Sequence, residues 1–314
     1  MRVLVTGGAG YIGSATVKSL IEHEHEVIVV DNLSKGKKEL VDKKAEFYKV
    51  DLVDMDLLSK VFEKYDFDAV MHFAAYKSVA ESMRNPKKYD HNVIGTQNLI
   101  KLMLKHNTPK IIFSSTAVVY KPKLEGEINE NDALAPISKY GQTKQRCEEL
   151  IKAAFKGTTI NYIILRYFNV AGDCGLGYID PEPENVFPII MEVISGKRDK
   201  FVIFGDDYDT FDRTCIRDYI EINDLVRAHV MALKSNLNGI INLGTSKGVS
   251  VKELVETAIK VTGKKFQYQF GPRRKGDPPR LVASNKMAMK ILGWQPKNNI
   301  REMIKTTFEA YKKI

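Results

Sequence analysis

Short apolar runs alternate with longer amphipathic stretches through the first half of the chain. The runs are rich in β-branched residues and are typical of buried strands, whereas apolar residues recurring every three or four positions indicate helices. Strands are expected at residues 2–6, 26–30, 46–50, 69–73, 110–115 and 160–166, and the main helices at 11–22, 57–65, 92–104 and 139–155. Strands separated by helices predict an α/β fold, with a Rossmann-like, doubly wound parallel sheet covered on both faces.

The regular alternation weakens after about Gly172, where prolines become frequent. Amphipathic helices are still expected at 186–195, 251–262 and 300–311. A helix at 222–233 followed by a strand at 239–243 resembles another αβ unit that returns to the first sheet. We therefore expect a dinucleotide-binding domain over 1–172 with a returning segment at 219–245, and a smaller, discontinuous α/β substrate domain over 173–314.

A glycine-rich segment, Gly7 to Gly13, separates the first strand from the first helix. Glycines at 7, 10 and 13 fit a tight turn, a close approach of backbone to phosphate, and close packing of the helix on the sheet. The N–H groups at the helix start would face a pyrophosphate. Asp31 ends the second strand, where a carboxylate binds the adenine ribose hydroxyls and repels a 2′-phosphate, which favours NAD over NADP. The alternative is a structural turn in an α/β protein that binds no nucleotide.

Tyr140 and Lys144 stand four positions apart on an expected helix, so their side chains share one face. The ammonium of Lys144 would stabilise the phenolate and lower the pKa of Tyr140 from its ordinary value toward working pH. A phenol tuned in this way can act as a general base. The preceding strand end, Phe113 to Thr116, points into the ligand crevice of a doubly wound sheet, where a hydroxyl can share a proton with the tyrosine. The alternative is a chance Tyr–Lys pair on an exposed helix.

Composition narrows the class of protein. The chain has 314 residues, 44% of them hydrophobic, and no run approaches the ~20 apolar residues of a membrane span. A core strand at the N-terminus leaves no room for a signal peptide, and three cysteines at no metal or redox spacing fit reduced thiols in the cytoplasm. The net charge of +9 comes from lysines scattered among acids. We interpret it as solvated surface and expect an anionic small-molecule ligand, with no nucleic acid and no membrane partner.

Several of these segments together resemble the extended short-chain dehydrogenase/reductase family, and the resemblance runs nearly end to end. It rests on the stretches at 7–13, 31–33, 73–82, 92–96, 113–116, 140–144, 166–169, 203–208, 216–219 and 272–277. It implies reversible 4-epimerisation of UDP-glucose and UDP-galactose through a 4-keto intermediate, with tightly bound NAD accepting and returning hydride. The alternatives are 4-epimerisation of another UDP-sugar (an N-acetylhexosamine, a pentose or a uronic acid) and a non-catalytic, nucleotide-sensing or RNA-binding relative.

The resemblance also implies roles for individual residues. Tyr140 would take the proton from the sugar 4-hydroxyl, Thr116 would hydrogen-bond that hydroxyl, and Lys144 would also hold the nicotinamide ribose. Contacts to NAD are implied for Gly7, Gly10, Tyr11, Ile12, Gly13, Asp31, Asn32, Asp51, Leu52, Phe73, Ala74, Ala75, Lys77, Asn92, Ser114, Tyr140, Lys144 and Tyr167. Contacts to the UDP-sugar are implied for Thr116, Asn169, Asn185, Val202, Phe204, Arg217, Arg274 and Asp277. No metal is expected, and a homodimer is expected through the helices at 92–104 and 139–155.

Three positions depart from relatives in ways that bear on the reaction. Related dehydratases carry an Asp–Glu pair directly after the strand-end threonine, whereas Ala117 and Val118 stand here, so elimination lacks its acid and base. Leu281 occupies a position where a tyrosine in some relatives blocks N-acetylated sugars. Because leucine is smaller, we expect the pocket to admit UDP-N-acetylglucosamine as well as UDP-glucose.

Overall fold

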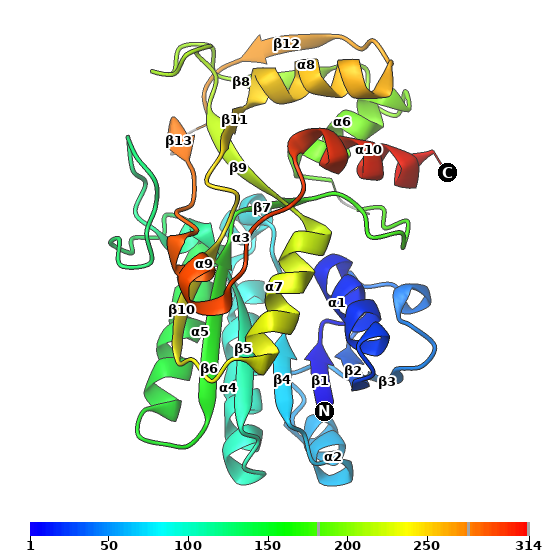
Figure 1. The fold of residues 1–314 in the computed structure, drawn as a ribbon, viewed down its shortest axis with the longest axis vertical. Coiled ribbons are helices and arrows are strands. Elements are labelled where there is room, and N and C mark those ends of the chain that lie inside the picture. Colours follow the sequence, from blue (N-terminus) through cyan, green and yellow to red (C-terminus); the bar gives the residue numbers. More distant parts are fainter. Residues whose placement is uncertain (181–182, 275–276, 313–314) are drawn as a thin grey trace. The chain divides into compact units, whose positions relative to one another are not determined.

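A seven-stranded sheet with the order β10–β6–β5–β4–β1–β2–β3 organises the computed structural model (Figure 1). Its strands are β1 (Arg2–Thr6), β2 (Glu26–Asp31), β3 (Glu46–Lys49), β4 (Ala69–His72), β5 (Lys110–Thr116), β6 (Asn161–Tyr167) and β10 (Gly239–Leu243). The pairs β1–β2, β1–β4, β2–β3 and β4–β5 run parallel. The predicted Rossmann-like sheet is confirmed, and β10 joins it beside β6, as expected of the returning αβ unit.

The structure describes residues 1–180, 183–274 and 277–312, and the chain divides into two units. The first unit comprises residues 1–121, 133–166 and 226–241, and the second comprises 122–132, 167–225 and 242–314. Residues 122–132 and 167–172, assigned above to the first domain, belong to the second unit. The segment that returns to the first unit is 226–241, shorter than the expected 219–245.

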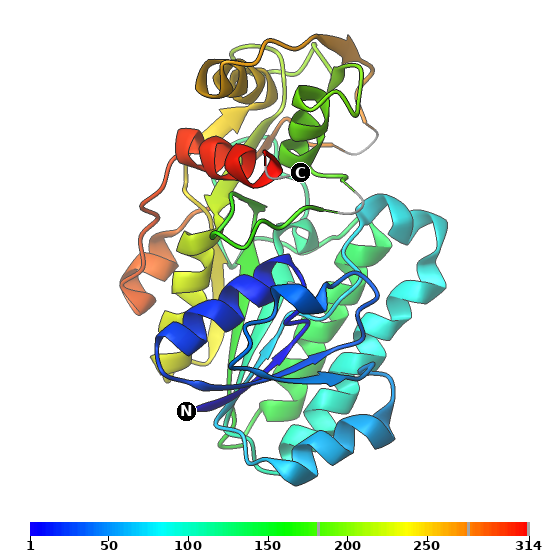
Figure 2. The ribbon, with the colours of Figure 1, turned by 90° about the vertical axis from the view of Figure 1, so that its right-hand side faces the viewer.

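Helices cover both faces of the large sheet (Figure 2). Because neighbouring strand residues point to opposite faces, Ile28 and Val30 of β2 enter one core and Val29 faces the other side. The first core takes in apolar residues of α2 (Met55–Lys64), α4 (Asp90–Lys105) and α5 (Lys139–Phe155). On the other face, α1 (Tyr11–Glu22) packs so closely that a side chain at Gly8 would lie 2.7 Å from Val29 and 3.2 Å from Val17.

The second unit is built on shorter elements. In its larger sheet β9 (Ile216–Glu221) pairs in parallel with β7 (Asn169–Ala171) and β13 (Arg280–Leu281), and antiparallel with β11 (Gly248–Ser250). A second sheet pairs β8 (Phe201–Phe204) with β12 (Tyr268–Gly271). Three helices, α6 (Val186–Ile194), α8 (Val251–Thr262) and α10 (Ile300–Tyr311), share a core with β8 and β9.

The remaining helices are α3 (Val79–Arg84), α7 (Ile222–Lys234) and α9 (Lys286–Leu292). Within the described part of the chain, no helix combines the length and the apolar character needed to cross a bilayer.

Asp218 is a polar centre of the second unit, and its side chain is fully buried. Its Oδ1 accepts the N–H of Thr245 at 2.8 Å and the hydroxyl of the same residue at 2.7 Å. Its Oδ2 accepts the N–H groups of Ser246 at 3.0 Å and Ala283 at 3.1 Å. The carboxylate therefore ties two distant segments to β9, directly beside Arg217.

Replacement of Asp218 by alanine should leave three backbone N–H groups without their acceptor, one of them buried and two partly buried. We expect Asp218→Ala to lower the free energy of unfolding by about 3 kcal/mol, because each buried unsatisfied donor costs about 1–3 kcal/mol. Chemical denaturation measures the loss. The matched control is Asp199→Ala, at an exposed position, which should change stability by less than about 0.5 kcal/mol. Equal losses in the two variants would refute the role assigned to Asp218.

Candidate functional site

Gly7, in the loop between β1 and α1, and Gly13, in the first turn of α1, have no room for a side chain. Gly7 has a φ of +72°, and a Cβ there would lie 2.6 Å from the nitrogen of Ala74. A Cβ on Gly13 would lie 2.0 Å from the carbonyl oxygen of Gly7. Helix α1 starts at Tyr11, directly after Gly10, which has no side chain to cap the helix start. Glycines without side chains let a ligand approach the backbone, and the N-terminus of α1 offers free N–H groups. Together they form a cradle suited to a pyrophosphate, so these residues fit a dinucleotide.

Asp31 ends β2 and lies buried against this loop. Its Oδ2 accepts the N–H of Ala9 at 3.0 Å, and its Oδ1 accepts the N–H of Leu33 at 2.8 Å. Burial raises the pKa of Asp31, and the two backbone hydrogen bonds act in the opposite direction. Each carboxylate oxygen keeps a further lone pair, so Asp31 can still accept a ribose hydroxyl. Beside it, the Asn32 amide donates to Asp51 Oδ2 at 2.8 Å.

Asn92 of α4 holds the segment that follows β4. Its Oδ1 accepts the N–H of Tyr76 at 2.8 Å, and its Nδ2 donates to the carbonyl of the same residue at 3.0 Å. The segment begins with Phe73 and Ala74, whose N–H groups both donate to the carbonyl of Thr6. The other residues predicted to contact NAD here are Ala75 and Lys77, on either side of Tyr76, and Leu52, which is buried against Gly95 of α4.

Tyr140 and Lys144 of α5 lie against the end of β5. The side chain of Lys144 is buried, and its Nζ donates to the carbonyl of Ser114 at 2.7 Å. The half-buried Tyr140 is hydrogen-bonded to the hydroxyl of Thr116. Since that hydroxyl also accepts the N–H of Val118 at 3.3 Å, its own proton is available to the phenol oxygen. The structure therefore brings the three predicted catalytic residues to one place in the first unit.

The predicted lowering of the Tyr140 pKa by Lys144 is wrong for this structure. Burial raises the pKa of Tyr140 to about 12, the hydrogen bond from Thr116 opposes the shift, and Cys147 adds to it. The physical reason is that burial destabilises the phenolate while the ammonium is directed at the Ser114 carbonyl. Burial also lowers the pKa of Lys144 to about 8, against the opposing effects of Cys147 and Glu148.

In the second unit, Arg217 of β9 is joined to Asp277. Its Nη2 donates to Asp277 Oδ1 at 2.8 Å, and its Nη1 donates to the carbonyls of Ile216 at 2.8 Å and Pro278 at 3.0 Å. The guanidinium of Arg274 lies 4.1 Å from the ring centroid of Phe204. Lys275 and Gly276, which belong to the same motif, lie outside the described residues.

The other residues predicted to bind the substrate also lie in the second unit. Asn169 donates to the carbonyl of Asp218 at 3.2 Å, and Asn185 directly precedes α6. Val202 pairs with Gln269 in the small sheet. Tyr167 is the one predicted NAD contact assigned to the second unit, and Thr116 is the one predicted sugar contact assigned to the first.

Ser115 and Asp218 stand in stretches that carry the resemblance. Sequence reasoning gave no role to either of them and did not name Glu148, and all three side chains are buried. It quoted Arg166 in a motif but gave it no role. Glu148 carried a usable signal, because it directly follows Cys147 in the stripe predicted to be buried, where a carboxylate needs a partner. Asp218 carried no such signal, since its partners come from segments that are distant in the sequence.

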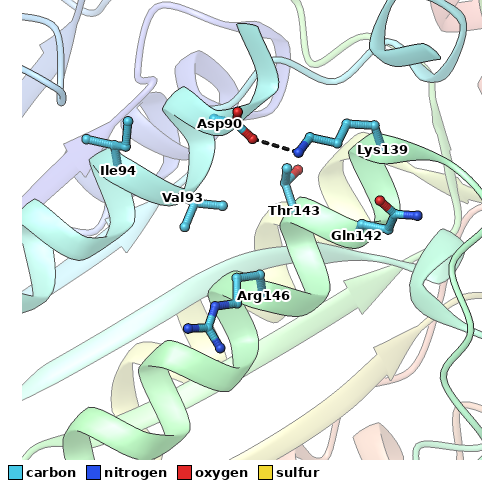
Figure 3. A pocket seen from close by; sticks show the side chains of 7 residues that line it. All are labelled: Asp90, Val93, Ile94, Lys139, Gln142, Thr143 and Arg146. Carbon is cyan, nitrogen blue, oxygen red and sulfur yellow. Dashed lines mark ion pairs between the residues drawn. The ribbon is translucent and has the colours of Figure 1, made fainter. Parts of the chain in front are cut away.

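A shallow groove lies between α4 and α5 in the first unit (Figure 3). Its lining consists of Asp90, Val93, Ile94, Lys139, Gln142, Thr143 and Arg146, and an ion pair of 2.7 Å joins Lys139 to Asp90. The groove contains none of the residues predicted to be catalytic or to bind NAD. Among the residues that the structure describes, no three His, Cys, Asp or Glu side chains gather as a metal site would require.

Gly10, directly before α1, and Gly13, in the first turn of α1, give a test that separates folding from dinucleotide binding. A Cβ on Gly13 meets backbone at 2.0 Å, whereas a Cβ on Gly10 meets only the Gly7 oxygen at 3.4 Å. We expect Gly13→Ala to lower the melting temperature strongly, and Gly10→Ala to fold normally but to lose most of its bound dinucleotide. Differential scanning fluorimetry and the nucleotide released on denaturation measure the two effects. Full retention of dinucleotide by folded Gly10→Ala would contradict the assignment.

Comparisons with known proteins agree with this geometry. The model of the NAD dependent epimerase/dehydratase family matches residues 3–244. The chain is 45% identical to a UDP-glucose 4-epimerase of Lactobacillus helveticus, covering 99% of this chain and 97% of that protein. It is similar to the structure of UDP-glucose 4-epimerase from Bifidobacterium longum in complex with NAD+ and UDP (TM-score 0.93, 34% identity, 100% and 98% of the chains covered).

Another similar structure is the UDP-Glc/GlcNAc 4-epimerase from Campylobacter jejuni, with a TM-score of 0.89 and 40% identity over 100% of this chain and 99% of that one. The family model alone covers more than half of the chain, and the solved structures match it throughout. A glycine cradle for a dinucleotide and a Thr–Tyr–Lys set at the end of β5 are therefore parts of a protein that belongs to the NAD dependent epimerase/dehydratase family.

Proposed function

We propose that this chain catalyses the reversible 4-epimerisation of UDP-glucose and UDP-galactose with tightly bound NAD. The observation that carries the proposal is the hydrogen bond between Thr116 and Tyr140 beside the buried Lys144. The high identity to UDP-glucose 4-epimerases over nearly the full chain supports the same substrate pair.

Tyr140 is the general base that removes the proton from the sugar 4-hydroxyl. Thr116 donates to the phenol oxygen and so stabilises the phenolate that must form before the proton is taken. Lys144 brings a positive charge to the same helix face. When bound, NAD supplies the acceptor, and then the donor, of hydride for C4 of the sugar. Return of the proton from Tyr140 to O4 of the 4-keto sugar completes the cycle, so atoms and electrons balance without an external reductant.

NAD binds to three segments of the first unit: the glycine loop, the end of β2 and the segment after β4. The loop at 7–13 supplies the pyrophosphate cradle, and Asp31 accepts a ribose hydroxyl. Lys77 and Tyr167 contribute contacts to phosphate and to the nicotinamide region. For the UDP-sugar, Arg217 and Arg274 supply planar guanidinium groups for the diphosphate.

The residues after Thr116 favour epimerisation over elimination. Ala117 is buried, and Val118 donates its N–H to the Thr116 hydroxyl. Neither side chain can donate or accept a proton, whereas expulsion of the sugar 6-hydroxyl needs both an acid and a base at this strand end.

A second substrate class is favoured by Leu281 of β13. This residue pairs with Arg217 of β9 in the larger sheet of the second unit, so it lies next to a residue proposed to bind the diphosphate. A leucine there leaves more room than a tyrosine and offers no hydroxyl. The similarity to the UDP-Glc/GlcNAc 4-epimerase from Campylobacter jejuni supports a pocket that accepts N-acetylated sugars as well.

We further propose a cytoplasmic homodimer that serves galactose metabolism. The groove between α4 and α5 supports pairing of these helices with a second copy, because it exposes Val93 and Ile94 beside an ion pair (Figure 3). Ile94 is 41% exposed, and Leu104 on the same helix is equally exposed. Three cysteines without disulfides, Cys147, Cys174 and Cys215, fit a reducing compartment.

Tyr140→Phe tests the proposed chemistry. The variant keeps the ring but loses the group that moves the proton, so kcat should fall by about 10²–10⁴-fold while NAD stays bound. Product identification after incubation with UDP-galactose, without added reductant, measures turnover. Tyr162→Phe, on β6, is the matched control and should keep wild-type kcat. A non-catalytic nucleotide-sensing or RNA-binding protein would show no epimerisation in the wild type and no effect of either change.

Leu281→Tyr tests the breadth of the sugar pocket. We expect the wild type to turn over UDP-N-acetylglucosamine as well as UDP-glucose, and the variant to lose at least about tenfold in kcat/KM for the acetylated sugar alone. The added ring fills the space that the N-acetyl group needs, whereas a hydroxyl at that carbon remains tolerated. A coupled assay on both sugars measures the ratio. The second substrate class is wrong if the wild type leaves the acetylated sugar unchanged.

Ile94→Glu tests the proposed dimer. A carboxylate at an exposed position of the groove lining opposes burial against a second copy, so the variant should be monomeric at concentrations where the wild type is dimeric. Light scattering after size exclusion measures the mass. Ile291→Glu, at another exposed isoleucine on α9, is the control and should leave the mass unchanged. A monomeric wild type would refute the dimer.

A further inference from the structure

Glu148 is a buried carboxylate that the proposed chemistry does not use. It lies on α5, four residues after Lys144 and eight after Tyr140, and its side chain is 1% exposed. Its Oε1 accepts Arg166 Nε at 2.9 Å and the hydroxyl of Ser115, and its Oε2 accepts Arg166 Nη2. Burying an ion pair is often no more stabilising than burying apolar residues of similar volume. The pair is therefore weak evidence for stability, so its position relative to the proposed catalytic residues matters more.

Ser115 of β5, which donates its hydroxyl to Glu148, lies between two residues that bind the predicted catalytic side chains. Ser115 follows Ser114, whose carbonyl accepts Lys144, and precedes Thr116, which is hydrogen-bonded to Tyr140. Three hydrogen bonds thus join α5 to three consecutive residues at the end of one strand. A helix held at three such points cannot rotate or slide along the sheet without breaking at least one of them.

Arg166 in turn is fixed to the sheet. It lies on β6, the neighbour of β5 in the sheet, and its guanidinium is 4.7 Å from the ring centroid of Tyr120. Its side chain is 1% exposed, as is that of Glu148. Glu148 is therefore bound by residues of two neighbouring strands, Ser115 of β5 and Arg166 of β6. These contacts fix its position relative to the sheet.

We propose that Glu148 is a positioning residue for the epimerisation: paired with Arg166 and bound by Ser115, it fixes helix α5 so that Tyr140 and Lys144 meet the end of β5. The inference deepens the proposed function and rests on it for its kinetic consequences. Glu148 touches neither substrate nor cofactor in this assignment and acts through the helix that carries both catalytic side chains.

The charge of Glu148 adds a second consequence. Burial lowers the pKa of Lys144 to about 8, and Cys147 and Glu148 oppose that shift. Burial, and to a lesser extent the positive charge of Lys144, lowers the pKa of His72 to about 3, so this histidine is neutral. Lys144 and Glu148 are surrounded by other titratable and charged groups from several elements. These are Tyr140 and Cys147 on α5, His72 on β4, Tyr89 at 86–89, Tyr120 after β5, and Arg166 on β6. Loss of the Glu148 carboxylate removes a negative charge that keeps Lys144 protonated.

The decisive variant is Glu148→Gln, which keeps the size of the side chain and removes its charge. We expect kcat to fall by about ten- to a hundredfold, as small misplacements of catalytic groups do, with KM for UDP-glucose changed less than about twofold. The alkaline limb of the kcat profile should move to lower pH, because Lys144 deprotonates more easily without the Glu148 charge. Glu149→Gln changes the exposed next residue, which pairs with Arg146 at 3.3 Å, and should leave kcat, KM and the pH profile as in the wild type.

Two further variants separate positioning from folding. Glu148→Gln combined with Arg166→Gln leaves no unpaired buried charge, and Ser115→Ala removes one hydrogen bond while keeping the ion pair. Both should lower kcat more than they raise KM, with the smaller loss in Ser115→Ala. The three variants to compare are Glu148→Gln, the double variant and Ser115→Ala, each checked to be folded and to hold NAD. If any of them shows the wild-type kcat and pH profile, the proposal is overturned.

A readout independent of turnover distinguishes this inference from the proposed function. Crystal structures of the wild type and Glu148→Gln should show the contact between Lys144 Nζ and the Ser114 carbonyl, 2.7 Å here, lengthened or lost in the variant. An unchanged contact would overturn the positioning role. A wild type that does not epimerise UDP-sugars would refute the proposed function and leave the crystallographic comparison decisive for Glu148.

Discussion

A buried ammonium held by a strand carbonyl is the interaction on which the catalytic arrangement depends. Lys144 cannot reach the Ser114 carbonyl unless α5 lies close to the end of β5, and that closeness also brings Tyr140 to Thr116. Burying a charged amine is costly, so its surroundings must supply acceptors and a counter-charge. The Ser114 carbonyl is the acceptor, and Glu148 is the nearby anion.

The two units differ in the kind of element that carries the residues predicted to act. Parallel strands of the large sheet end at one edge, so the glycine loop, Asp31 and Thr116 all follow or end strands of the same sheet. The second unit offers short strands and loops whose guanidinium groups are held by carbonyls, a carboxylate or a ring, as Arg217 and Arg274 show. Rigid strand ends suit proton transfer, whereas arginines on short elements suit recognition of a diphosphate.

Local patterns predicted the large sheet and its helices well, because burial on both faces leaves long apolar runs and clear helical stripes. Strands of two to four residues in the second unit, such as β13, have no periodicity of their own and are defined by pairing with β9. Spacing also placed Tyr140 and Lys144 on one helix face. It could not give the pKa of Tyr140, because desolvation and the direction of the Lys144 ammonium depend on tertiary contacts.

The raised pKa of Tyr140 has a consequence for when the base can act. At a pKa of about 12 the phenol is protonated at neutral pH, and each unit of lowering corresponds to about 1.4 kcal/mol of preferential stabilisation of the phenolate. The hydrogen bond from Thr116 supplies part of that stabilisation, and the rest requires additional positive charge close to the phenol oxygen. Bound NAD in its oxidised form would supply positive charge of this kind. Proton removal by Tyr140 is therefore expected to be easier when the oxidised cofactor is bound than in its absence.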